Sequence, residues 1–339
     1  MATQAPRPHA PLSPGSPERR LTPAEAAEFA ARLRTNVERA VRGKTEVVRR
    51  AVETVIAGGH LLLEDVPGVG KTTLAHALAR SLRASFRRIQ FTSDLLPSDV
   101  VGVGLPAPGD GRAAGSFVFQ PGPIFAHVVL ADEVNRASPK TQSALLEVMG
   151  EGSVTVDGVS HSLPRPFLVI ATQNPLEQFG THPLPESQLD RFLMRLRLGY
   201  PAPADEAAVL REDPATNELP RLAPVLTVDD VLALRDACAA VKFDDALVGY
   251  LLRIVAETRE HEGLRLGVSP RGAVALRRAA QARALGEGRD YCIPDDVRDL
   301  ALDVLGHRVS VAAHGAAPGG SEQAEWILRE ILDRTPVPL

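Results

Sequence analysis

Short apolar runs dominate the part of the chain between residues 60 and 198. The runs at 60–63, 128–131 and 167–171 are nearly continuous in apolar character, as expected of strands covered on both faces. Stretches with helical character separate several of the runs, an order typical of a parallel sheet flanked by helices. We therefore predict an α/β fold whose strands are 60–63, 86–91, 128–131, 167–171 and 193–198.

Before the first strand, the chain changes character at residue 21. The first 20 residues hold five prolines, a spacing that no helix or strand interior tolerates, and they are predicted to be a disordered tail. Thr22, Pro23 and Glu25 then have the arrangement of a helix N-terminus. Helices are expected from there to about residue 42 and again over 46–57.

After residue 200 the apolar runs stop, and five prolines mark a linker over 201–225. Helix starts are predicted at Thr227, which has Asp230 three residues later, and at Ser269, which precedes Pro270. The chain is thus divided into a tail (1–20), an α/β core (21–200), the linker (201–225) and a small all-helical domain (226–339). An amphipathic stripe in that last domain consists of Leu247, Tyr250, Leu251, Ile254 and Val255.

A glycine-rich loop joins the first strand to a helix, which is the context of a phosphate-binding loop. Gly68 and Gly70 let backbone N–H groups turn toward a triphosphate. Lys71 is expected to hold the β- and γ-phosphates, and Thr72 to ligate Mg²⁺. The predicted ATP-binding residues of the loop are Asp65, Val66, Pro67, Gly68, Val69, Gly70, Lys71, Thr72 and Thr73.

Asp65 stands where the general loop pattern has glycine. Aspartate tolerates unusual turn dihedrals, so we expect the loop to form despite this difference.

Two carboxylates end the apolar strand at 128–131. A buried strand can place charge only at its tip, where a ligand can meet it. Downstream of a phosphate-binding loop, Asp132 is expected to hold Mg²⁺ and Glu133 to orient and deprotonate the attacking water.

Three further polar residues are candidates for the same chemistry. Asn174 follows the strand at 167–171 and is placed to sense the γ-phosphate, although Asn-Pro alone is an ordinary turn signal. Arg191 precedes the last strand and could offset transition-state charge in a neighbouring subunit, or simply pair with Asp190. Arg271, in the first turn of the Ser269 helix, could contact phosphate or lie on the surface.

Composition limits the partners and the compartment. The net charge is −4, so the chain has no overall basic field that would recruit nucleic acid. Cys238 and Cys292 lie far apart without metal-ligand spacing and read as reduced cysteines in a helical core. No signal-peptide pattern or bilayer-length apolar stretch is present, so we expect a cytoplasmic protein without direct membrane insertion.

Taken in this order, the motifs resemble those of AAA+ ATPases and, most closely, of the MoxR group. The resemblance covers about residues 25–308 and implies a P-loop AAA+ core followed by a helical lid. It implies that Asn174 is sensor 1, that Arg271 is sensor 2, and that Arg191 is the better candidate for an arginine finger, with Arg136 a weaker alternative. A finger acting in trans further implies a homo-oligomer, usually a hexameric ring. The matching stretches are 63–73, 132–137, 171–175, 185–192 and 268–271.

Two inserts fit the same group. Segments 94–103 and 117–125 look like its helix-2 insertion. In 151–163 apolar residues alternate around Asp157-Gly158, the strongest two-residue hairpin signal. In related machines such inserts face a pore and could grip a client, but a hairpin that only packs is a nearly equal alternative.

The resemblance implies Mg²⁺- and ATP-dependent remodelling, maturation or activation of partner proteins, with a von Willebrand factor A-domain protein as partner and an unidentified client. A nucleic-acid motor stays open because replicative helicases share the insertion pattern, but the acidic charge and lack of a basic–aromatic cluster disfavour it. A metal-chelatase motor subunit is a further alternative. A nucleotide-dependent scaffold with slow turnover is disfavoured by the intact Lys71, Asp132 and Glu133.

Overall fold

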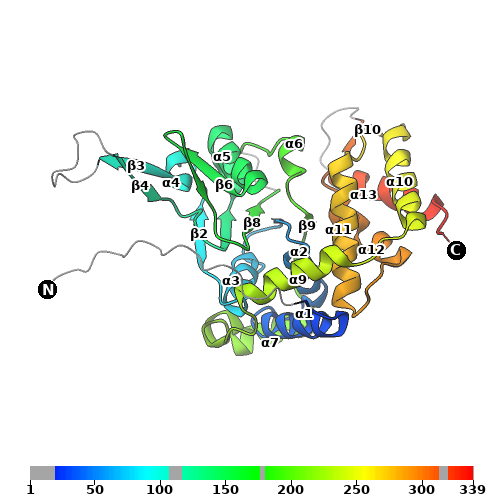
Figure 1. The fold of residues 1–339 in the computed structure, drawn as a ribbon, viewed down its shortest axis with the longest axis horizontal. Helices are drawn as coiled ribbons and strands as arrows, with labels where there is room; N and C mark the ends of the chain where they lie inside the picture. Colours follow the sequence, from blue (N-terminus) through cyan, green and yellow to red (C-terminus); the bar gives the residue numbers. More distant parts are fainter. Residues whose placement is uncertain (1–19, 107–116, 176–179, 313–319, 339) are drawn as a thin grey trace.

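A five-stranded parallel sheet lies at the centre of the computed structural model, which describes residues 20–106, 117–175, 180–312 and 320–338 (Figure 1). The predicted α/β fold is confirmed, and the predicted tail lies outside the described residues except for Arg20. In spatial order the strands are β2 (Phe86–Gln90), β5 (Val128–Asp132), β8 (Leu168–Gln173), β1 (Leu61–Glu64) and β9 (Met194–Leu196).

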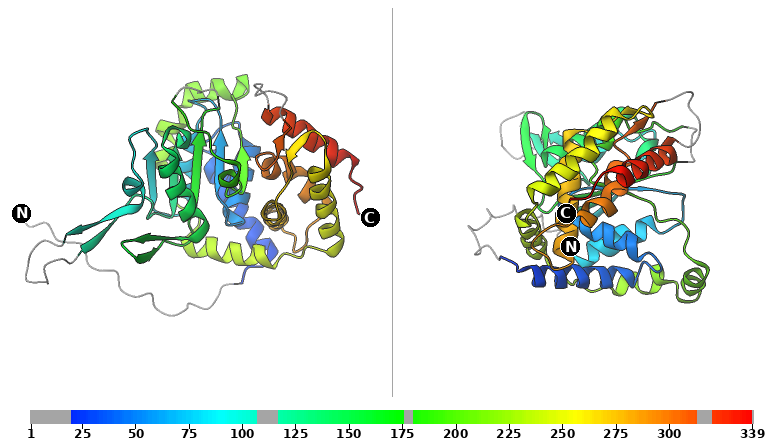
Figure 2. Two further views of the ribbon diagram at one scale, coloured as in Figure 1. Left: turned by 90° about the horizontal axis from the view of Figure 1, so that it is seen from above. Right: turned by 90° about the vertical axis from the view of Figure 1, so that its right-hand side faces the viewer.

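Alternation along each strand divides the interior into two clusters. Leu61 and Leu63 of β1 point into one cluster and Leu62 into the other, because successive side chains leave opposite faces of a sheet. The first cluster also takes in helices α1 (Pro23–Glu38), α2 (Thr45–Ile56) and α3 (Lys71–Ser81), and the second takes in α4 (Pro97–Val101) and α5 (Pro139–Glu151). The sheet is therefore covered on both faces (Figure 2).

Parallel pairing brings the carboxyl ends of the strands to one edge. Glu64 at the end of β1 pairs with Gln173 of β8, and Gln90 of β2 pairs with Asp132 of β5. Segments that follow these ends must therefore lie close together, at the edge where parallel α/β sheets usually bind ligands. The 3-10 turn η1 (Val134–Arg136) follows β5, and the short helix α6 (Glu186–Leu189) lies between β8 and β9 in the chain.

Both predicted inserts contain hairpins. β6 (Ser153–Val156) and β7 (Val159–Ser162) are antiparallel, and Asp157 and Gly158 both have positive φ, 51° and 78°, as a type I′ turn requires. β3 (Gly102–Pro106) pairs with β4 (Phe117–Pro121), and this ribbon extends away from the sheet (Figure 1). The ring of Phe119 stacks on His161 at 3.9 Å between centroids, so the two hairpins contact each other.

The stretch expected to be a linker holds short helices. Two of its prolines start helices instead of interrupting them, since the missing N–H is not needed in a first turn. Pro203 and Pro214 each take the first position of a helix. The elements are α7 (Pro203–Glu212), α8 (Pro214–Asn217) and the 3-10 turn η2 (Leu219–Arg221), after which α9 (Val228–Ala240) begins.

The C-terminal helical region follows the predicted pattern with one addition. Ser269 caps its helix by accepting from the Gly272 N–H at 3.0 Å, and the whole predicted apolar stripe is buried. A small antiparallel pair, β10 (Leu264–Leu266) with β11 (Ser310–Val311), also occurs in this region, which we had expected to be all-helical. Its helices are α10 (Asp245–Glu260), α11 (Pro270–Gly286), α12 (Pro294–Leu305) and α13 (Gly320–Arg334).

Within the described ranges, no helix has the length and apolar character needed to cross a bilayer.

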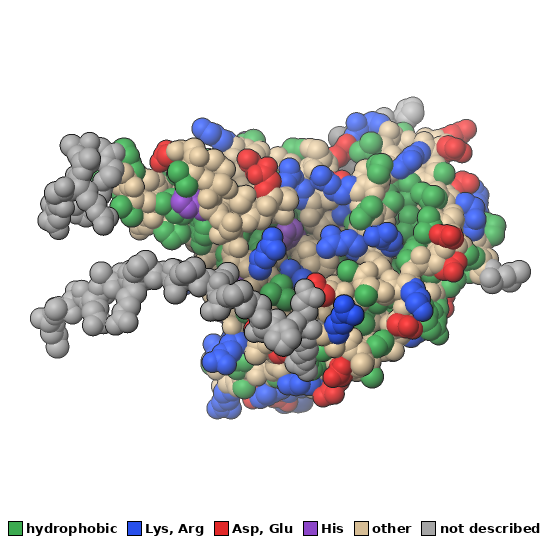
Figure 3. Space-filling model, in the orientation of Figure 1, with side chains coloured by type: hydrophobic (Ala, Val, Ile, Leu, Met, Phe, Trp, Pro, Cys, Tyr) green, Lys and Arg blue, Asp and Glu red, His purple; other side chains and the backbone are tan. Residues whose placement is uncertain are grey.

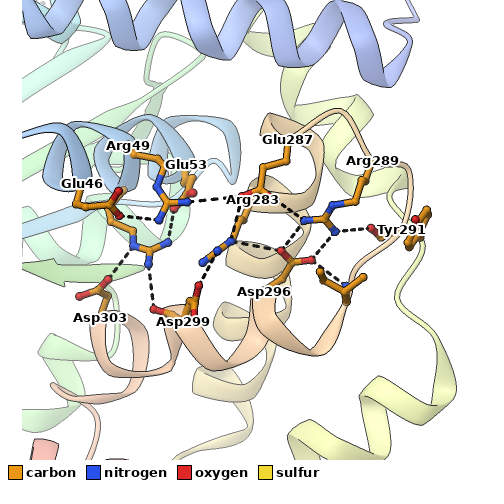
Figure 4. Close-up of polar contacts among 12 residues, drawn as sticks. Glu46, Arg49, Glu53, Arg283, Glu287, Arg289, Tyr291, Asp296, Asp299 and Asp303 are labelled. Carbon is orange, nitrogen blue, oxygen red and sulfur yellow. Dashed lines mark hydrogen bonds and ion pairs between the residues drawn. The ribbon is translucent and has the colours of Figure 1, made fainter. Parts of the chain in front are cut away.

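A charged cluster ties this region to the core (Figure 4). Arg50 of α2 donates to Glu53 on its own helix at 3.1 Å and reaches α12, where its Nε lies 3.0 Å from Asp303 and its Nη2 donates to the Asp299 carbonyl at 3.0 Å. Arg283 of α11 pairs with the Asp299 carboxylate at 2.6 Å. The cluster thus joins α2 to α11 and α12, so that the α/β core and the helical region share polar contacts as well as an apolar interior.

Replacing Asp296 with alanine is expected to lower the free energy of unfolding by about 3 kcal/mol, because it removes the most buried carboxylate that pairs with Arg283 and Arg289. Asp296 is 1% exposed in its side chain and accepts both Nη groups of Arg289 at 2.7 Å, while Arg283 lies 3.4 Å away. Urea unfolding measures the change. Asp295→Ala, at an exposed neighbouring position, is the control, with an expected loss below about 1 kcal/mol. Equal losses would contradict the assigned role of the buried carboxylate.

Candidate nucleotide site

A pocket of about 330 Å³ opens at the carboxyl edge of the sheet. It gathers the loop after β1, the acidic pair after β5 and Asn174 after β8. The strand register explains the meeting, since these segments leave neighbouring strands at the same edge. The lining residues are Pro67, Gly68, Gly70, Lys71, Thr72, Thr73, Arg88, Asp132, Glu133 and Asn174.

The glycines of the loop leave room for a phosphate. Gly68 and Gly70 have φ of 86° and 98°, values that side chains other than glycine rarely adopt. A Cβ added at either position would meet nothing within 4 Å, so the loop borders open space. Helix α3 starts at Lys71, directly behind the loop, with its positive dipole end toward that space. The cradle therefore fits a triphosphate.

Asp65 fastens the start of the loop. Its Oδ1 accepts from the Val66 N–H at 2.8 Å, and its Oδ2 accepts from the Gly199 N–H at 2.6 Å. The carboxylate thus replaces a flexible glycine with a link between the loop and the chain that follows β9. Asp65, Val66 and Val69 belong to the loop but do not line the pocket.

The Lys71 ammonium points back along the loop and donates to the Asp65 carbonyl at 2.6 Å. Partial burial lowers the pKa of Lys71 from its ordinary value, while the carboxylates of Asp65, Asp132 and Glu133 oppose that change. The side chain therefore lies among negative groups that favour its charged form.

Thr172 fixes the acidic pair from the adjacent strand. Its hydroxyl donates to Asp132 Oδ1 at 2.6 Å and accepts from the Glu133 N–H at 2.9 Å. Glu133 itself has φ of 57°, a left-handed conformation that costs a non-glycine residue of order 1 kcal/mol. The turn directs the two carboxylates into one pocket, where Asp132 and Thr72 together provide the oxygen ligands that Mg²⁺ prefers.

Both carboxylates have partners that sequence reasoning missed. Arg88 donates to Asp132 Oδ2 through Nε at 3.1 Å and Nη2 at 2.6 Å. Gln90 donates to Glu133 Oε2 at 2.8 Å, and Arg136 pairs with the same oxygen at 3.1 Å. Arg88 and Gln90 lie two residues apart in a predicted strand, so the sequence already places them on one face of the sheet. It does not show that this strand lies beside β5, which carries Asp132 and Glu133 at its end.

Arg191 and Arg271 lie elsewhere, in a second pocket of about 270 Å³ between the end of α5 and the start of α11. The described lining residues of the two pockets have no member in common. Arg191 Nη1 donates to the Leu146 carbonyl at 2.7 Å, and Arg278 and Arg308 line the same pocket. Figure 3 shows Lys and Arg side chains gathering around the middle of one face of the molecule.

Arg271, a candidate for contact with phosphate, does not line the pocket at the phosphate-binding loop, and the packing of α11 explains its position. Ser269, the cap of α11, donates to Asp190 Oδ2 at 3.2 Å, and this holds Arg271 Nε 4.0 Å from the same carboxylate. Asp190 also accepts from Arg308 Nε at 2.8 Å. The carboxylate considered as a partner for Arg191 is thus committed to the helical region.

Comparison with known proteins agrees with this organisation. Residues 60–194 match the ATPase family associated with various cellular activities (AAA), and residues 256–331 match the AAA lid domain. The protein YeaC of Bacillus subtilis is 49% identical over 304 residues, which are 90% of this chain and 93% of YeaC. Chaperone MoxR1 of Mycobacterium tuberculosis is 38% identical over 338 residues, 95% of this chain and 88% of that protein.

Among solved structures, a protein of Cytophaga hutchinsonii provisionally described as an ATPase has a similar fold. The TM-score is 0.83 at 36% identity, and the match covers 94% of this chain and 97% of that one.

Proposed function

This chain belongs to the MoxR family of AAA ATPases, and from that premise we propose that it hydrolyses Mg²⁺-ATP to remodel, mature or activate partner proteins. The observation that carries the proposal is the convergence of Lys71, Asp132 and Glu133 on one open pocket at the carboxyl edge of the sheet. That convergence supports phosphoryl transfer over simple nucleotide storage, because storage needs no general base.

Five side chains of the pocket and the loop backbone each have a proposed task. Backbone N–H groups of the loop and Lys71 bind and orient the β- and γ-phosphates. Thr72 and Asp132 would hold Mg²⁺, which supplies charge neutralisation between the phosphates when bound. Glu133 accepts a proton from the attacking water, and Asn174 orients the reacting group.

We assign the arginine pocket to a second copy of the chain. Arg191 and Arg271 line a pocket separate from the loop, so neither completes the site of its own subunit in this arrangement. The phosphates of a nucleotide bound in an adjacent copy would meet these guanidinium groups, so the loop of one copy and the arginines of the next would together form one complete site. The proposal is a homo-oligomeric ring, taken to be a hexamer, with Arg191 as finger and Arg271 beside it. Arg136 is disfavoured as a finger because it pairs with Glu133.

The proposed partner is a von Willebrand factor A-domain protein, in the cytoplasm, with a client still to be identified. The β3–β4 ribbon supports contact with another protein: Leu105, Phe117 and Val118 are 45%, 65% and 55% exposed. Leu105 and Val118 lie opposite each other across the ribbon and share a face, while Phe117 leaves the other face. An interacting protein would cover these exposed apolar side chains.

The test is a substrate trap. The full chain carrying Glu133→Gln is expected to retain nucleotide and, with ATP present, to enrich a von Willebrand factor A-domain protein or a cofactor-containing enzyme identified by mass spectrometry. Lys71→Ala, which should bind nucleotide poorly, is the matched control. Nucleic acid on the trap, or the same proteins on trap and control, would contradict the remodelling proposal.

A further inference from the structure

Arg88 lies against the carboxylate that we assign to the metal. Two of its N–H groups meet Asp132 Oδ2, at 3.1 and 2.6 Å, and the Asp132 side chain is only 10% exposed. The other oxygen, Oδ1, accepts the Thr172 hydroxyl at 2.6 Å. Oδ2 is therefore the oxygen that Thr172 leaves open, and the guanidinium of Arg88 occupies it with charge-assisted hydrogen bonds.

The same guanidinium also contacts Gln90. Arg88 Nη2 donates to Gln90 Oε1 at 2.9 Å, and Gln90 Nε2 in turn donates to Glu133 Oε2 at 2.8 Å. An amide has one oxygen and one NH₂ group, so the bond from Arg88 fixes which end of Gln90 meets Glu133. The two carboxylates of the site are thus joined through one arginine and one glutamine.

The strand geometry makes this arrangement local and specific. Arg88 and Gln90 alternate with Ile89, which is buried in the interior, so both polar side chains leave the same face of β2. Gln90 is directly opposite Asp132 in the register, and the longer Arg88 side chain reaches forward from the pair Arg88–Leu130. Arg87, one residue earlier, leaves the opposite face and is exposed.

We propose that Arg88 is a displaceable internal cation: it holds Asp132 Oδ2 until a divalent cation takes that oxygen. This inference rests on the proposed nucleotide site. Arg88 then leaves Oδ2, and its hydrogen bond to Gln90 is lost with it. Arg88 is a positioning residue by this account, since it acts through Asp132, and it raises the concentration of divalent cation that the site requires.

The competition has a measurable consequence. The Mg²⁺ concentration that half-saturates binding of a fluorescent, non-hydrolysable ATP analogue should fall about fivefold in Arg88→Ala. A half-exposed ion pair of about 1 kcal/mol gives a change of this size. Arg88→Gln, which keeps much of the side-chain length without the charge, should behave alike. Arg87→Ala is the control on the opposite face and should need the same Mg²⁺ concentration as the unmodified chain.

Three other outcomes separate this inference from the proposed function. An unchanged Mg²⁺ requirement in both Arg88 variants, with nucleotide binding intact, would reduce Arg88 to a surface ion pair and overturn the inference. Equal weakening of analogue binding with and without Mg²⁺ would make Arg88 a phosphate ligand and overturn it as well. If the unmodified chain binds no analogue under either condition, the proposed nucleotide site itself fails, and the inference fails with it.

Discussion

Replacing Glu133 with glutamine is expected to lower ATP turnover by at least about a hundredfold while nucleotide binding is kept. Glutamine preserves the shape of the side chain but cannot accept a proton from water, and a positioned general base contributes about 10²- to 10⁴-fold. Phosphate release measures turnover, and a fluorescent nucleotide measures binding. The Glu133 side chain is positioned by a left-handed backbone and by hydrogen bonds from Gln90 and Arg136, which an amide can largely retain.

Glu147→Gln, an exposed position on α5, is the matched control and should turn over ATP like the unmodified chain. Turnover in Glu133→Gln within threefold of the unmodified chain would remove Glu133 from the role of base. Parallel loss of binding and turnover would instead mean that the substitution disturbs the pocket.

Replacing Arg191 with alanine is expected to lower turnover by about 10³-fold, at the lower end of what an arginine finger supplies. Nucleotide binding should be unaffected, because Arg191 does not line the pocket at the phosphate-binding loop of its own subunit. The same two assays test this expectation on the full chain. Arg191→Lys should recover little activity, since a single ammonium cannot reproduce the fork of a guanidinium.

Arg277→Ala, on the exposed side of α11, is the control for loss of a nearby positive charge. Activity close to normal in Arg191→Ala would leave the Leu146 contact as the only assigned purpose of this side chain. In that event Arg271, in the same pocket, becomes the next candidate to replace.

Local features of the sequence were enough to predict the sheet and the phosphate-binding loop. A near-continuous apolar run such as 128–131 is typical of a strand that is covered on both faces. Charged residues directly after such a strand indicate the edge of the sheet where a ligand can bind. The cap of α1 at Thr22 and the turn at Asp157-Gly158 are equally local and are also confirmed. Each depends on residues within about four positions of one another.

What the sequence could not supply depends on packing between distant segments. The position of Arg271 follows from the bonds of Asp190 with Ser269 and Arg308, which lie 79 and 118 residues away along the chain. Arg88 meets Asp132 only because β2 and β5 are neighbours. The short helices within the predicted linker at 201–225 could not be predicted, because a proline at the first position of a helix and a proline in a loop look the same in a sequence.

If two copies of the chain together form each hydrolytic site, an assembly that mixes two inactive variants should recover activity. Glu133→Gln and Arg191→Ala chains, carrying different tags, would be co-expressed, purified through both tags and assayed for phosphate release. The Arg191→Ala chain keeps Glu133, and the Glu133→Gln chain keeps Arg191. Where these two chains are neighbours, one interface has both residues, and turnover should rise well above that of either variant alone. Turnover no higher than that of the separate variants, with the unmodified chain active, would contradict the composite site.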